Sequence, residues 1–183
     1  MVKYMKWIYK LMILNIVTIV TSIPVVTLGA SLAAMFQILG SEEDAIVKPF
    51  FTAYVKHLKK SLPLTVGFLV MTTGAVMMRA SIWGLLLLVE LSAVYLASIQ
   101  IMTRNHLGIK ELVKNGFIMG NHLMGHHLVG LLFAYGILKF GVHVPAIGVF
   151  MGISLWGYGY DKLFKSGYFR TLGQLRRLNH ENV

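Results

Sequence analysis

The residues of this chain that could bind a metal ion or transfer protons are one glutamate and several histidines inside its apolar stretches. Glu90 is the single charged residue between Ala80 and Thr103. If a helix entered the membrane at Ala80, Glu90 would lie about 15 Å deep, near the midplane of the bilayer. A carboxylate at that depth is costly, so Glu90 is a candidate functional residue. The alternative is a protonated carboxyl group that hydrogen-bonds to a neighbouring helix, and the sequence leaves both interpretations open.

Three histidines, His122, His126 and His127, occur in the next apolar stretch. Because His122 and His126 are four residues apart, a helix would place their imidazoles on one face. Together with Glu90 they could ligate a divalent metal ion or transfer protons. The segment contains no His-Glu-x-x-His motif, and histidines that bond across helices or face lipid headgroups are the favoured interpretation. A metal site of Glu90, His122 and His126 is therefore a secondary hypothesis, and no resident cofactor is predicted.

The sequence lacks the residues that other common kinds of catalytic site require. The chain contains no cysteine, which excludes thiolate metal sites and cysteine nucleophiles. Its two aspartates, Asp44 and Asp161, lie outside the apolar stretches, so they do not form the pair that an intramembrane aspartic protease needs. No glycine-rich phosphate-binding loop follows a predicted strand. We therefore do not expect an enzyme.

The elements that carry these residues are predicted to be membrane-spanning helices. Of the 183 residues, 56% are hydrophobic and 13% are charged, a composition that a soluble domain of this size could not accommodate. Residues 11–39, 61–78, 117–138 and 140–160 contain no Asp, Glu, Lys or Arg. Because backbone groups in lipid must be satisfied internally, each stretch is predicted to be helical. The sequence predicts an all-α, polytopic transmembrane bundle of five or six helical segments.

The first stretch, residues 11–39, is predicted to be broken near its middle. Pro24 removes a backbone donor, Thr27 can cap a following helix, and Gly29 loosens the backbone. The stretch is therefore either one kinked span or a hairpin. The positive-inside rule favours the hairpin, because it leaves only Arg79 and Lys139 outside and places both termini in the cytoplasm.

Residues 44–61 are predicted to form an amphipathic helix on the membrane surface. Apolar residues with helical spacing alternate with basic ones; these are Ile46, Val47, Phe50, Phe51, Tyr54, Val55 and Leu58, and Lys48, Lys56, Lys59 and Lys60. Membrane lipids are favoured over a specific protein partner for this helix. The net charge of +10 is likewise attributed to topology and anionic lipid, so no nucleic acid partner is predicted.

The whole chain, residues 1–183, is predicted to form one transmembrane domain. After the interfacial helix, spans are expected at about 62–78, 80–103, 117–138 and 140–160, and a basic cytoplasmic tail at 161–183. Glycines recur in the last two spans and predict close helix packing, within the chain or in a homo-oligomer.

The first half of the chain resembles the YesL-like family of small bacterial integral membrane proteins of uncharacterised function. The resemblance covers roughly residues 11–78 and is carried by Asn15, by Ser22-Ile-Pro-Val-Val-Thr-Leu-Gly-Ala and by the Phe50-Phe51 segment up to Lys60. It implies a small helical protein of the bacterial inner membrane. Members of the family are often encoded beside carbohydrate ABC importers and glycan-degrading enzymes. The family has no known catalytic residues that could be assigned to positions of this chain.

Two functions are therefore considered. The leading hypothesis is a non-catalytic accessory or scaffold subunit that associates with the permease or ATPase subunits of a carbohydrate ABC importer. Its candidate interface residues are Pro24, Thr27, Gly29 and the predicted helix at residues 44–61, here called the Phe50 helix. The alternative is a small membrane carrier or metal-binding protein that uses an intramembrane cluster of Glu90 and His126.

Overall fold

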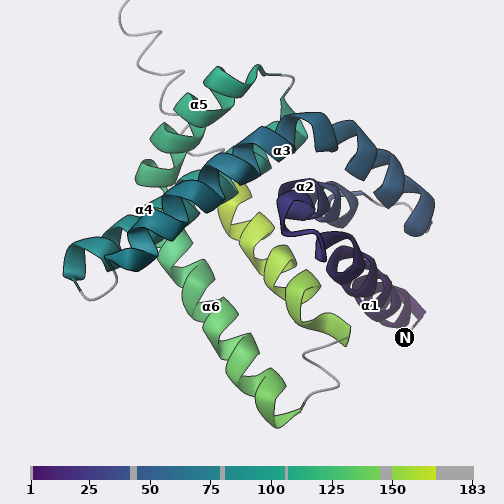
Figure 1. Cartoon of the computed structure of the whole chain (residues 1–183). Helices are drawn as coiled ribbons and strands as arrows, with labels where there is room; N and C mark the ends of the chain where they lie inside the picture. Colours follow the sequence, from purple (N-terminus) through teal and green to yellow (C-terminus); the bar gives the residue numbers. More distant parts are fainter. Residues whose placement is uncertain (1, 42–44, 79–80, 106, 145–149, 168–183) are drawn as a thin grey trace, which may run out of the picture.

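The computed structural model describes residues 2–41, 45–78, 81–105, 107–144 and 150–167, and this part of the chain contains no strand. The helices are α1 (Val2–Ser22), the 3-10 turn η1 (Val25–Thr27), α2 (Leu28–Leu39), α3 (Val47–Met77), α4 (Ile82–Arg104), α5 (Ile109–His122) and α6 (Met124–His143). Residues 150–167 form a further helix, here called the C-terminal helix, drawn in yellow-green in Figure 1. The predicted all-α fold with a broken first helix is confirmed.

The break between α1 and α2 is held by Thr27. Its hydroxyl oxygen lies 2.7 Å from the carbonyl oxygens of both Thr21, in the last turn of α1, and Pro24, which also accepts from the Thr27 backbone N–H at 2.8 Å. The side chain makes no capping hydrogen bond to α2. Thr27 is at the N-cap position of α2, as predicted, but its predicted capping hydrogen bond is wrong: the hydroxyl donates backwards to the preceding turn, since the 3-10 turn brings those carbonyls within reach.

The chain folds back after this break, so that α1 and α2 form a hairpin. Lys10 Nζ donates to the carbonyl oxygen of Ser41, 2.6 Å away, which places the end of α2 near the middle of α1. With 12 residues, α2 is about 18 Å long, well short of the roughly 30 Å hydrocarbon core. Figure 1 shows α2 between α1 and α3, and most of its residues are buried. This short helix is the centre of the core.

Helix α3 is continuous, which corrects the predicted boundary between an interfacial helix at 44–61 and a span at 62–78. Pro63 lies inside it, and Figure 1 shows that α3 bends along its length. One buried face runs across the proline through Ala53, His57, Ser61 and Thr65. Its packing on α2 offsets the missing hydrogen bond and keeps the two segments in one helix.

Helices α4 and α5 pack closely in antiparallel fashion. A Cβ on Gly120 would lie 3.0 Å from the Val94 nitrogen, so the two backbones approach each other as small residues in membranes permit. The single helix predicted over 117–138 is interrupted at Leu123, between the end of α5 and the start of α6. Helix α6 then leaves α4 and runs beside the C-terminal helix (Figure 1), where the Trp156 indole donates to the Gly130 carbonyl oxygen at 3.1 Å.

The end of the chain also differs from the prediction. Helix α6 continues through Lys139 to His143, so the boundary predicted at residue 139 lies inside a helix. Residues 161–167 belong to the C-terminal helix, whereas the rest of the predicted tail lies outside the described residues.

Four helices of the described chain are long and apolar enough to cross a membrane, namely Tyr4–Ser22, Val47–Met77, Ile82–Arg104 and Met124–His143. These helices indicate a membrane protein.

Candidate functional site

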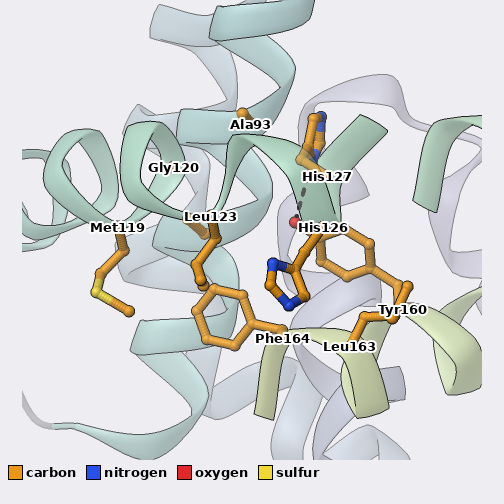
Figure 2. A pocket seen from close by; sticks show the side chains of 10 residues that line it. Ala93, Met119, Gly120, Leu123, His126, His127, Tyr160, Leu163 and Phe164 are labelled. Atoms are coloured by element: carbon orange, nitrogen blue, oxygen red, sulfur yellow. Dashed lines mark hydrogen bonds between the residues drawn. The ribbon is translucent and has the colours of Figure 1, made fainter. Parts of the chain in front are cut away.

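A buried polar cluster joins α4, α6 and the C-terminal helix. His127 Nε2 lies 3.0 Å from the Ser92 hydroxyl oxygen, and His127 Nδ1 lies 3.2 Å from the Tyr160 hydroxyl oxygen. His127 and Tyr160 are almost fully buried, and Figure 2 shows the latter contact as a dashed line. A neutral imidazole has one donor and one acceptor, so both ring nitrogens are satisfied by hydroxyl groups that can take either role. The cluster links the packed pair of α4 and α5 to α6, which runs away from α4.

Aromatic rings enclose this cluster. The Tyr160 ring stacks on Trp156 with centroids 5.4 Å apart and on Phe164 with centroids 6.5 Å apart. Phe36, from the central helix α2, lies 6.1 Å from Tyr160. The polar atoms are therefore held within an apolar wall, an arrangement that orients helices in a membrane.

His126, the predicted candidate, does not take part in this hydrogen-bonded cluster. It is half-buried and lines a small cavity with Met119, Leu123 and Phe164 (Figure 2). The cavity is about 10 Å³, at the lower limit for a single water molecule. The space beside His126 therefore has no room for a substrate.

The predicted metal site is not assembled. Within the described residues, no group of three or more His, Asp or Glu side chains could hold a metal ion. His122 is exposed at the end of α5, and Glu90 is half-buried on α4. The interruption at Leu123 is the physical reason, because two histidines four residues apart share a face only on a continuous helix.

A second polar cluster, around the buried Asp161, lies at the C-terminal end of α4, and it could not be found from the sequence alone. Arg104 Nη2 lies 2.7 Å from Asp161 Oδ1 and donates at 2.9 Å to Gln100 Oε1. Lys165 Nζ lies 2.6 Å from Asp161 Oδ2. The Asp161–Lys165 spacing of four was a visible signal. The partnership with Arg104, 57 residues away, had no local signal in the sequence.

The predicted Pro24–Thr27–Gly29 motif positions the hairpin. A Cβ on Gly29 would contact Thr65 Oγ1 and would lie 2.9 Å from the Tyr95 hydroxyl oxygen. These two oxygens are themselves 3.0 Å apart. Only a residue without a side chain lets α2 sit this close to α3 and α4.

The Phe50 helix divides its predicted residues between core and surface. Phe50 is fully buried, whereas 45% of Phe51 is exposed. Lys56 and Lys59 are exposed, and Lys60 Nζ donates to the Leu107 carbonyl oxygen at 3.0 Å. This segment is therefore attached to the core through Phe50 and Lys60 and leaves Lys56 and Lys59 outside.

Comparison with known proteins yields one partial match. Residues 10–79 match a family described as "Protein of unknown function, DUF624". No curated protein and no solved structure matches the chain. The matched segment contains α2, α3 and residues 10–22 of α1, and therefore the contact of Gly29 with Thr65 and the Phe50 helix. The His127 and Asp161 clusters lie outside the matched segment. The similarity to this uncharacterised family therefore covers less than half of the chain.

Proposed function

We propose that this protein is a non-catalytic accessory or scaffold subunit of a membrane complex. The observation that carries the proposal is the exposure of α6. Of its 20 residues only His127 and Gly130 are buried, while Leu132 and Leu138 expose about 70% of their surface. A helix so little covered by its own chain offers its sides to lipid or to the helices of a partner.

Small residues on α6 favour a partner helix. A Cβ added at Gly125 or Gly136 would meet no atom within 4 Å, so these glycines pack against nothing in the described chain. In lipid, helices associate through such positions because their backbones can approach closely there.

The buried polar groups also support a scaffold. His127, Ser92 and Tyr160 are engaged with one another, as are Arg104 and Asp161. These contacts join helices, and the cavity beside them is too small for a solute.

The finer parts of the proposal rest on the resemblance of residues 11–78 to the YesL-like family. We propose a bacterial inner-membrane location with both termini in the cytoplasm, which the distribution of Lys and Arg supports. We further propose the permease or ATPase subunit of a carbohydrate ABC importer as the partner, with Pro24, Thr27 and the Phe50 helix as further interface candidates. This assignment is an analogy with the genetic surroundings of that family.

The test is affinity purification of the full chain from native membranes in mild detergent, followed by mass spectrometry. We expect a transporter subunit in near-stoichiometric amount. Gly136→Leu, which fills an open position on α6, should release it, whereas Gly74→Leu, which fills an open position on α3, should not. Recovery of the protein alone, as monomer or homo-oligomer, would refute the accessory role.

A further inference from the structure

A hollow of about 400 Å³ lies between the end of α2 and the first half of α3. Its polar lining consists of Gln37, Ser41, Lys48, Thr52 and Lys56. Lys48, Thr52 and Lys56 follow one another at intervals of four residues, so they form one row along α3. Two ammonium groups and a hydroxyl therefore line the same side of one hollow.

The first half of α3 presents three different faces. Phe50, Ala53 and His57 are buried against the rest of the chain. Beside them, Val47, Phe51 and Val55 form an apolar stripe in which each residue exposes 45–66% of its surface. The lysine row occupies the third face.

The apolar stripe sets the depth of the hollow in the membrane. Exposed apolar residues beside a row of lysines are typical of helices that lie at the boundary between headgroups and acyl chains. Lysines at this boundary extend their ammonium groups to the headgroup region. The hollow is therefore at the level of lipid phosphates.

We propose that the hollow binds the phosphate-bearing headgroup of an anionic phospholipid. Lys48 and Lys56 supply the positive charge, and basic pockets between membrane helices recognise anionic headgroups in this way. Gln37 Oε1 is 2.9 Å from His57 Nε2, which leaves the Gln37 amide NH₂ as a donor for the ligand. The Thr52 hydroxyl contacts the Lys48 carbonyl oxygen at 3.0 Å and can still accept from a lipid hydroxyl. This proposal does not rest on the accessory role proposed above.

The same helix supplies a matched control. Lys59 is exposed and carries the same charge, but it does not line the hollow. Replacing Lys59 by glutamine changes the surface potential of the helix as much as replacing Lys48 or Lys56 does. A difference between these variants therefore reports the hollow itself.

The experiment is native mass spectrometry of the purified full chain after exchange into phosphatidylglycerol or into phosphatidylcholine with the same acyl chains. We expect one phosphatidylglycerol to be retained in preference to phosphatidylcholine. Lys48→Gln and Lys56→Gln should each weaken this retention by about fivefold. Lys59→Gln should leave it unchanged, and Thr52→Val should weaken it less than the lysine variants. Unaltered thermal unfolding of the variants would show that their fold is intact.

Three outcomes would overturn the proposal. Equal losses in all three lysine variants would indicate diffuse attraction to the helix surface. Equal retention of the two lipids would mean that the hollow does not attract anionic headgroups. That result would follow if the acidic residues after Ser41 in the sequence, Glu42, Glu43 and Asp44, neutralise its lysines. Displacement of the lipid by millimolar glycerol phosphate would identify a site for a soluble anion.

Discussion

Arg104 and Asp161 form an ion pair, with 2.7 Å between Nη2 and Oδ1, that ties the end of α4 to the C-terminal helix. The Arg104 guanidinium also lies over the Phe164 ring, 5.2 Å from its centroid. The Asp161 side chain is 7% exposed, so its charge is stabilised by the two cations beside it rather than by water. The pair is a structural link between helices that are distant in the sequence.

Removal of the Asp161 charge should destabilise the fold. In Asp161→Asn, Arg104 and Lys165 lose their shared counterion, and we expect the free energy of unfolding to fall by about 1.5–3 kcal/mol. Thermal unfolding in detergent measures this change. Lys165→Gln removes a partner that is 40% exposed and should cost less than about 1 kcal/mol. Equal effects of the two substitutions would contradict a buried role for Asp161.

Gly29→Ala should loosen the packing of the hairpin. Its Cβ would overlap Thr65 Oγ1 and crowd the Tyr95 hydroxyl, and we expect a loss of about 1–3 kcal/mol in detergent unfolding. Gly67→Ala on α3 meets no atom within 4 Å and should be neutral or slightly stabilising. Combining Gly29→Ala with Thr65→Ala should recover part of the loss, because the overlapping hydroxyl is then absent. Strictly additive effects would argue against this contact.

The histidine cluster predicts a graded series of effects. Tyr160→Phe removes one hydroxyl from the Ser92–His127–Tyr160 chain and should cost about 0.6 kcal/mol, the average for hydrogen bonds between membrane helices. His127→Ala removes both hydrogen bonds and leaves a cavity, so its loss should be larger. His122→Ala, at an exposed position, should change stability by less than about 0.5 kcal/mol. A greater effect at His122 than at His127 would mean that the histidines have other partners.

Cysteine labelling can test the hairpin, since the chain has no cysteine of its own. Ser81→Cys should react with a membrane-impermeant maleimide on intact cells, whereas Lys110→Cys should react only after permeabilisation. Ile23→Cys lies at the turn between α1 and α2, about 18 Å beyond the level of Lys10 and Ser41. Although Ile23 is exposed, we expect it to react from neither side, because it faces hydrocarbon. Reaction of Ile23→Cys from outside would show that α1 crosses the membrane completely.

Much of the architecture could be predicted from the sequence, whereas little of the candidate site could. The helical class follows from hydropathy, and the break at Pro24 from local backbone chemistry. The continuity of α3 across Pro63 and the interruption at Leu123 were mispredicted. In both cases packing between helices outweighs the local signal: α2 supports α3 across its proline, and α6 turns away from α4 to reach the C-terminal helix.

The sequence by itself determined that the chain is helical and suited to a membrane, because a backbone in lipid must satisfy its hydrogen bonds within each segment. It also determined where basic residues flank those segments. Only the tertiary structure decided that His127, rather than its neighbour His126, is the buried histidine, and that Asp161 meets Arg104. Adjacent residues on a helix point in directions about 100° apart, so the rotation of α6 against α4 and the C-terminal helix selects between them. That rotation results from contacts between residues far apart in the sequence, which local patterns do not record.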